Sequence, residues 1–206
     1  MSERKLKVGV LISGRGSNLK ALIKACAAAD FPAEIVLVIS NVADAGGLKY
    51  AADAGIACTT ISHKPFPSRE AFDAVVDAAL HEAGVELICE AGFMRIHSEG
   101  FVRKWLGRII NIHPSLLPAF KGTHVHEQVI AAGVKVSGCT VHYVIPELDA
   151  GPIIAQSEVP VLPGDTTETL AMRVLEAEHK TYPRAVKWIA EGKVRFENGA
   201  AVFAER

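Results

Sequence analysis

Short apolar runs separated by helix-like segments dominate the first half of the sequence. The runs cover residues 8–12, 34–40, 57–61 and 85–91, and the continuous apolar run at 8–12 is typical of a strand buried on both faces. Between them, apolar residues recur at helical spacing, as in the segment that follows Ser68, a residue suited to an N-cap. Strands that alternate with helices in this way favour a parallel sheet covered by helices. We therefore predict an α/β fold with a doubly wound, mostly parallel, Rossmann-like sheet.

The C-terminal part of the sequence breaks this alternation. Residues 136–144 and 153–159 are two further strand-like runs, joined by a short polar excursion. Residues 165–168 resemble a capping box that opens a long helix, and residues 194–203 carry Asn-Gly between two apolar runs, which is a strong hairpin signal. We therefore expect an antiparallel C-terminal part beside the parallel sheet.

Composition limits the class of protein. Half of the 206 residues are apolar, which allows a sizeable core, and the formal net charge of -1 argues against nucleic acid or a membrane surface as the main partner. The four cysteines are widely separated and are expected to be reduced. The sequence shows neither a signal-peptide core at its start nor an apolar run of ~18 residues. We expect one cytoplasmic domain, 1–206, divided into an N-terminal half, 1–107, and a C-terminal half, 108–206.

A glycine-rich loop at residues 13–18, Ser-Gly-Arg-Gly-Ser-Asn, joins the first apolar run to the first helix. Glycines let the backbone approach an anion, and the N–H groups of a helix N-terminus favour phosphate. The loop has neither the G-x-G-x-x-G nor the Walker pattern, so NAD or ATP binding is not indicated. An ordinary tight turn, with Ser17 or Asn18 as the N-cap, is the alternative, and both interpretations can hold together.

Residues 108–118, Arg-Ile-Ile-Asn-Ile-His-Pro-Ser-Leu-Leu-Pro, form a short apolar strand that ends in polar residues. Asn111 and His113 are two positions apart and should face the same way, near the end of the strand where ligands gather in open α/β sheets. An amide that stabilises an oxyanion beside an imidazole that moves protons is suited to acyl-type transfer. The alternative is a strand followed by a polar loop, with His113 bound to a backbone carbonyl.

Three further charged residues stand out. Asp149, between the two late strand-like runs, could orient and charge-stabilise a histidine, or could form an Asx turn before Gly151. Glu178 lies within an apolar stripe of the last helix, where a carboxylate needs a basic side chain or an amine-bearing ligand. Arg69, in the first turn of its helix, is unfavourable to the helix dipole and could bind an acid; a solvated surface arginine is the alternative.

Several motifs occur together in an order and spacing that closely resembles the phosphoribosylglycinamide formyltransferase family, whose members are folate-dependent. They are Ile-Ser-Gly-Arg-Gly-Ser-Asn-Leu at 12–19, Ala-Gly-Phe-Met-Arg-Ile at 91–96, Asn-Ile-His-Pro-Ser-Leu-Leu-Pro at 111–118, Leu-Asp-Ala-Gly-Pro at 148–152 and Ala-Glu-His at 177–179. The third motif is shared by enzymes that use 10-formyltetrahydrofolate, and the Gly-Ser-Asn loop together with Glu178 narrows the resemblance to this family.

The resemblance implies direct transfer of the formyl group of 10-formyltetrahydrofolate to the amine of N1-(5-phospho-ribosyl)glycinamide in purine (IMP) biosynthesis, without a metal. The first half would bind the phosphate, and the second half would hold the catalytic residues Asn111, His113 and Asp149. The residues implied for the ribonucleotide are Gly16, Ser17, Asn18, Leu175, Glu176, Ala177 and Glu178. Those implied for the folate are Arg69, Met94, Arg95, Ile96, His97, Asn111, Ile145, Pro146, Glu147, Leu148 and Asp149. The enzyme would be a monomer or homodimer.

Other interpretations remain open at this point. Formyltetrahydrofolate deformylase resembles this module with an added N-terminal domain, and methionyl-tRNA formyltransferase would add a basic C-terminal domain. A non-catalytic nucleotide-binding module is a third alternative, against which the residues Asn111, His113 and Asp149 argue. Two positions depart from the family pattern: His97 stands where an aliphatic residue is common, and Glu90 lies late in an apolar strand with no evident partner.

Overall fold

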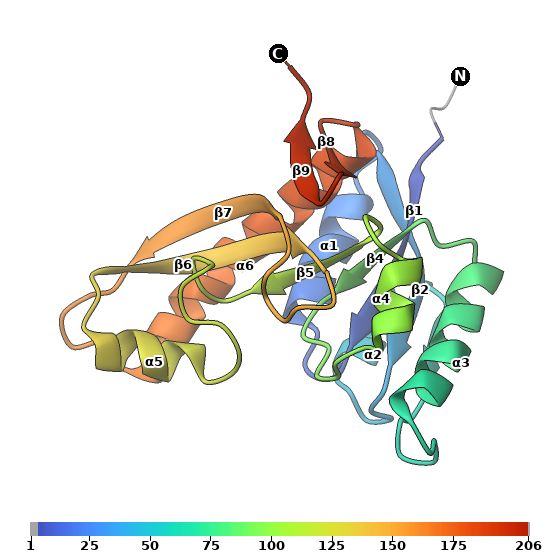
Figure 1. The fold of residues 1–206 in the computed structure, drawn as a ribbon, viewed down its shortest axis with the longest axis horizontal. Coiled ribbons are helices and arrows are strands. Elements are labelled where there is room, and N and C mark those ends of the chain that lie inside the picture. Colours follow the sequence, from blue (N-terminus) through green and yellow to red (C-terminus); the bar gives the residue numbers. More distant parts are fainter. Residues whose placement is uncertain (1–3, 206) are drawn as a thin grey trace. The chain divides into compact units, whose positions relative to one another are not determined.

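The computed structural model describes residues 4–205 and divides into two compact units, Met1–Ile110 and Asn111–Arg206. Within the described residues, strands β1 to β7 form a seven-stranded sheet in the order β3-β2-β1-β4-β5-β6-β7, and β8 pairs with β9 (Figure 1). The predicted α/β class is confirmed. The division between the units falls inside β5 rather than between residues 107 and 108.

The first unit alternates strands and helices as predicted. Its elements are β1 (Leu6–Ile12), α1 (Ser17–Cys26), β2 (Ala33–Ser40), α2 (Gly47–Asp53), β3 (Cys58–Thr60), α3 (Arg69–Glu82), β4 (Leu87–Glu90), α4 (Glu99–Lys104) and the start of β5 (Ile109–His113). The β1–β2, β1–β4 and β2–β3 pairs are parallel. A Cβ on Gly9 would lie 2.8 Å from Leu80 of α3, whereas Ile12 reaches Gly47 of α2. Because Gly9 and Ile12 point to opposite faces, helices cover both faces of β1.

The second unit is built on the antiparallel pair of β6 (Val136–Tyr143) and β7 (Ile153–Pro160). Helix α6 (Thr167–Ala190) packs along both strands, and α5 (Val125–Ala132) contacts α6 (Figure 1). The predicted hairpin is confirmed as β8 (Val194–Glu197) and β9 (Ala200–Phe203), joined by Asn-Gly at positive φ. Among residues 4–205, the helices include none that is both long and apolar enough to cross a membrane.

Two helix starts differ from the sequence prediction. Helix α1 begins at Ser17 with Gly16 at its N-cap and without a side-chain cap, so capping by Ser17 or Asn18 is wrong. The reason is backbone geometry: Gly16 has a φ of 75°, and a Cβ there would lie 2.4 Å from the Cα of Gly47. At α6 the capping box pairs Thr166 with Thr169, one residue later than predicted.

Candidate active site

His113 is buried at the end of β5, and its two ring nitrogens have different surroundings. Nε2 lies 2.8 Å from the backbone oxygen of Phe120. Since a carbonyl only accepts hydrogen bonds, Nε2 carries a hydrogen, and Nδ1 is left as the basic nitrogen. The alternative considered for the sequence, a histidine bound to a backbone carbonyl, therefore applies to Nε2. Nδ1 remains available for proton transfer.

Asp149 lies on the Nδ1 side of His113. Its Oδ1 is 3.7 Å from Nδ1, and its Oδ2 accepts a 2.8 Å hydrogen bond from the N–H of Gly122. Both side chains are buried, so water screens their interaction little. At 3.7 Å the pair is longer than a hydrogen bond, yet close enough for the carboxylate to stabilise a charged imidazole. The structure thus brings together His113 and Asp149, as the sequence led us to expect.

The two backbone segments that meet His113 are strained. Phe120 and Asp149 have φ angles of 54° and 50°, in the left-handed region that costs a non-glycine residue roughly 1–2 kcal/mol. Ser115 contributes to holding the first segment, because its Oγ donates to the carbonyls of Ala119, at 2.6 Å, and Phe120, at 3.2 Å. Strain of this kind is concentrated at functional sites, where the surrounding contacts maintain it.

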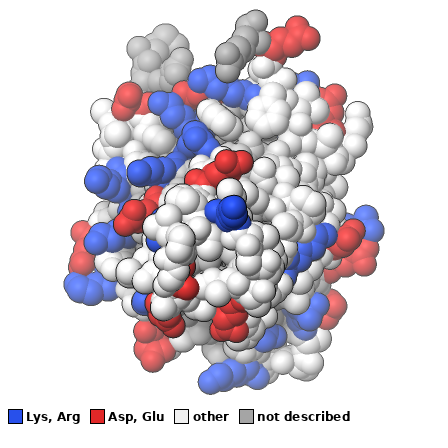
Figure 2. Space-filling model, turned by 90° about the vertical axis from the view of Figure 1, so that its left-hand side faces the viewer, with Lys and Arg blue, Asp and Glu red and all other residues white. Residues whose placement is uncertain are grey.

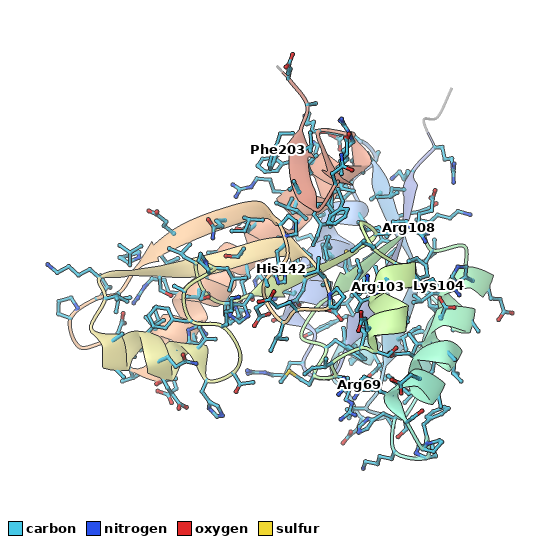
Figure 3. The ribbon with its side chains drawn as sticks, viewed as in Figure 1. Arg69, Arg103, Lys104, Arg108, His142 and Phe203 are labelled. Carbon is cyan, nitrogen blue, oxygen red and sulfur yellow. The ribbon has the colours of Figure 1, made fainter. Side chains whose placement is uncertain are left out.

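Asn111 is held by a residue that sequence reasoning missed, His142 near the end of β6 (Figure 3). Nδ1 of His142 lies 3.0 Å from the carbonyl of Tyr143 and must carry a hydrogen, so Nε2 is an acceptor. Asn111 Nδ2 lies 3.3 Å from that Nε2 and donates to it. The contact fixes which way the amide faces, and the second hydrogen of Nδ2 remains for another acceptor. Nothing local in the sequence distinguishes His142 from an ordinary strand residue.

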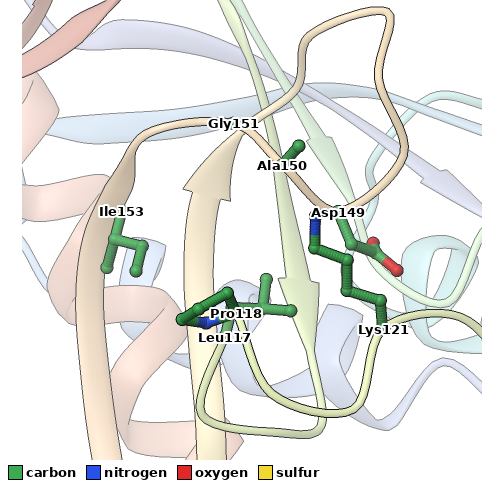
Figure 4. Close-up of a pocket in the computed structure, with 7 residues that line it drawn as sticks. All are labelled: Leu117, Pro118, Lys121, Asp149, Ala150, Gly151 and Ile153. Atoms are coloured by element: carbon green, nitrogen blue, oxygen red, sulfur yellow. The ribbon is translucent and has the colours of Figure 1, made fainter.

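A cavity of about 130 Å³ lies beside Asp149 (Figure 4). It is lined by Leu117, Pro118, Lys121, Asp149, Ala150, Gly151 and Ile153. Gly151 is required by space: a Cβ there would lie 1.7 Å from the carbonyl oxygen of Tyr143. This close approach lets the chain turn back against the end of β6 and brings Asp149 to the cavity wall.

The other candidate residues of the second unit differ in exposure. Pro146, Glu147 and Leu148 are exposed on the loop before Asp149, and Ile145 is half-buried. On α6, Glu178 is buried, Leu175 and Ala177 are half-buried and Glu176 is exposed. A carboxylate therefore does lie on the apolar face of α6, as predicted.

In the first unit, the candidate phosphate loop has the shape that anion binding needs. Gly16 and Asn18 are buried, Ser17 is the first residue of α1, and the left-handed Gly16 turns the chain into the helix. The first N–H groups of a helix have no partner within it and carry the positive end of its dipole. Glycine at position 16 is thus the residue that permits this arrangement.

The candidate folate residues of the first unit are mostly at the surface. Arg69 begins α3 and is exposed (Figure 3), and the preceding Ser68 accepts a 3.1 Å hydrogen bond from Ala71, which confirms its predicted N-cap role. Met94, Arg95 and Ile96 are also exposed. His97 is different, because its imidazole is buried and faces away from solvent.

The mostly parallel sheet, with a fixed amide and a buried histidine at the end of β5, favours the transfer of an acyl-type group. The Formyl transferase family model matches residues 6–186. The chain belongs to the formyl transferase family. It is 43% identical to phosphoribosylglycinamide formyltransferase of Escherichia coli, over 95% of this chain and 92% of that protein.

Two further comparisons agree. The trifunctional purine biosynthetic protein adenosine-3 of Gallus gallus is 56% identical over 93% of this chain, which spans only 19% of that protein's length. Among solved structures, phosphoribosylglycinamide formyltransferase from Anaplasma phagocytophilum has 50% identity and a TM-score of 0.90, covering 98% of this chain and 96% of that one.

Proposed function

We propose that this chain transfers a formyl group from 10-formyltetrahydrofolate to the amine of N1-(5-phospho-ribosyl)glycinamide, a step of purine biosynthesis. The products are the N-formyl compound and tetrahydrofolate. The observation that carries the proposal is the arrangement of His113, with Nε2 committed to Phe120 and Nδ1 facing Asp149. The names of two relatives specify a formyl group and phosphoribosylglycinamide as its acceptor, and 10-formyltetrahydrofolate is the donor that the sequence resemblance implies.

The three catalytic residues have separate roles in this reaction. Asn111 donates an N–H to the formyl oxygen as negative charge develops there, while His142 holds the amide in that orientation. A carbon–nitrogen bond forms between the amine and the formyl carbon, and the bond from that carbon to the folate nitrogen breaks. His113 Nδ1 takes the proton that the amine loses and returns it to the leaving nitrogen. Asp149 stabilises the imidazole while it carries the extra proton.

The remaining candidate residues would bind the two substrates, each in a way that suits its chemistry. In the first unit, Gly16, Ser17 and Asn18 would hold the phosphate at the start of α1, and the exposed segment 94–96 together with Arg69 would contact the folate. In the second unit, the buried Glu178 would bind the glycinamide end, with Leu175, Glu176 and Ala177 beside it, and the loop from Ile145 to Leu148 would contact the folate.

The test is absorbance-monitored conversion of 10-formyltetrahydrofolate with and without the ribonucleotide. Turnover that requires the ribonucleotide is the expected result. Turnover with water alone would identify a deformylase and would contradict the roles given to the phosphate loop and Glu178. An absence of turnover under both conditions, with ligand binding retained, would identify a binding module instead.

We further propose that the enzyme acts on small molecules in the cytoplasm, as a monomer or homodimer. Acidic and basic side chains are interspersed on the face drawn in Figure 2, in keeping with the net charge of -1. A large single-sign field, as expected for a partner such as tRNA, is not what this surface offers. Sedimentation equilibrium would measure the oligomeric state, and a tetramer or larger assembly would contradict this part of the proposal.

A further inference from the structure

His97 lies between two carboxylates that reach it from different elements. Its Nδ1 is 2.7 Å from Oδ1 of Asp73 on α3, and its Nε2 is 3.1 Å from Oε1 of Glu90 at the end of β4. The second oxygen of Asp73 accepts a 2.5 Å hydrogen bond from the N–H of Ser98. The His97 side chain is only 2% exposed. Glu90, which had no evident partner in the sequence, is therefore paired with the other residue that departs from the family pattern.

This environment requires a charged imidazole. A neutral ring has one N–H, so one of the two carboxylates would face a lone pair, whereas the cation presents an N–H to each of them. Burial alone would lower the pKa of His97, but hydrogen bonds to Asp73 and Glu90 raise it to about 9. The ring also stacks on Phe93 and Phe101, with centroids at 5.2 and 4.2 Å and planes within 18° and 16° of parallel. Stacking on aromatic faces favours a cation further.

The cluster holds both ends of one surface segment, residues 91–96. Glu90 precedes the segment and His97 follows it, so their ion pair closes the loop between them. The middle of the segment is anchored separately, because the N–H of Met94 donates a 2.8 Å hydrogen bond to Ser13 Oγ at the end of β1. A segment fixed at its ends and its middle has little freedom to move.

Two of the three exposed side chains at 94–96 are apolar, and the third is that of Arg95. Met94 is 70% exposed and Ile96 is 55% exposed. Apolar side chains held outward on a backbone with three attachments are suited to a flat, partly apolar ligand, because ordering them costs little when the ligand binds.

We propose that His97 is a positioning residue for the folate: by bonding as a cation to Asp73 and Glu90, it holds residues 91–96 in the conformation that presents Met94 and Ile96. His97 is buried and does not itself touch the ligand. This inference rests on the proposed function and assigns a role to a side chain that stands where the family commonly has an aliphatic residue.

Three variants test the proposal. His97→Leu removes both donors. Asp73→Asn keeps one of the two side-chain oxygens that accept from His97 and Ser98. Its amide N–H group takes the place of the other oxygen and faces one of these two donors. His81→Leu is the matched control, because it removes a half-exposed histidine beside Asp77 on α3 and leaves the His97 cluster intact. In His97→Leu and Asp73→Asn we expect the KM for 10-formyltetrahydrofolate to rise about tenfold or more, with kcat and the KM for the ribonucleotide within about threefold of wild type. His81→Leu should stay within about threefold in all three parameters.

Hydrogen–deuterium exchange of the unliganded proteins gives a second readout that needs no activity. The amides of residues 91–96 should exchange faster in His97→Leu and Asp73→Asn than in wild type and His81→Leu. Unchanged exchange there, or a fall in kcat parallel to a rise of both KM values, would overturn the positioning role. Should His97→Leu not fold, Asp73→Asn decides by the same criteria against the same control. Wild-type enzyme without formyl transfer would refute the proposed function, whereas the exchange data would still test whether His97 holds the segment.

Discussion

Two buried histidines, His97 in the first unit and His113 in the second, lie beside carboxylates with opposite consequences. Both nitrogens of His97 face carboxylates, at 2.7 and 3.1 Å, whereas His113 has one nitrogen on a carbonyl and the other 3.7 Å from Asp149. The comparison teaches that an acid near a histidine does not by itself create a catalyst. When both nitrogens meet carboxylates, the proton is held in place; when one nitrogen remains short of a hydrogen bond, a proton can come and go.

Among the changes that test this difference between the two histidines, removal of the His113 imidazole should have the largest effect on kcat. In His113→Ala we expect kcat to fall by about 10²–10⁴, the usual contribution of general acid–base catalysis, with both KM values little changed. Steady-state kinetics with both substrates would measure it. The control is His81→Ala, which removes a half-exposed histidine paired with Asp77 and should keep wild-type kcat. A His113→Ala enzyme with kcat within threefold of wild type would mean that Nδ1 carries no proton in the reaction.

Replacement of Asn111 tests charge stabilisation separately from proton transfer at the same site. Losing one oxyanion donor typically costs on the order of 10²–10³ in kcat, so Asn111→Ala should lose this much while the pH profile of kcat keeps its shape. Asn111→Ala with near-normal kcat would contradict the oxyanion role. A changed pH profile would show that Asn111 acts through His113 rather than on the substrate.

The sequence predicts the parts of these sites that are local. Apolar runs predict the strands, Asn198-Gly199 predicts the last hairpin, and the spacing of Asn111 and His113 places both side chains on one edge. The helical spacing of apolar residues after Ser68 is an incomplete guide to α3, because Val75 is 42% exposed while Asp73 is buried. A polar residue can take a core position only if a partner meets it there. That partner, His97, is 24 residues away, so no local pattern reveals it.

The stability of the protein should depend on pH through His97. The pKa of His97 is about 9 in the folded protein, above its ordinary value of 6.5, so its stabilisation is complete below about pH 6.5 and is lost as pH rises through 9. The free energy of unfolding of wild type should therefore fall relative to that of His97→Leu, by on the order of 3 kcal/mol between pH 6 and pH 9.5. Urea unfolding at both pH values measures the gap. A constant gap would contradict the raised pKa of His97 in the folded protein.

A third buried histidine, His142, extends the comparison, and its replacement should have the smallest effect on kcat. Its Nδ1 donates to Tyr143 and its Nε2 accepts from Asn111, so it is expected to act as a neutral, fixed acceptor. Losing one such hydrogen bond is worth about 1 kcal/mol, so His142→Leu should reduce kcat by about tenfold or less. If it acts only through Asn111, the double variant His142→Leu/Asn111→Ala should be no slower than Asn111→Ala alone. Additive losses in this double-mutant cycle would instead show that His142 has a separate role, and the orientation of the Asn111 amide would then need another cause.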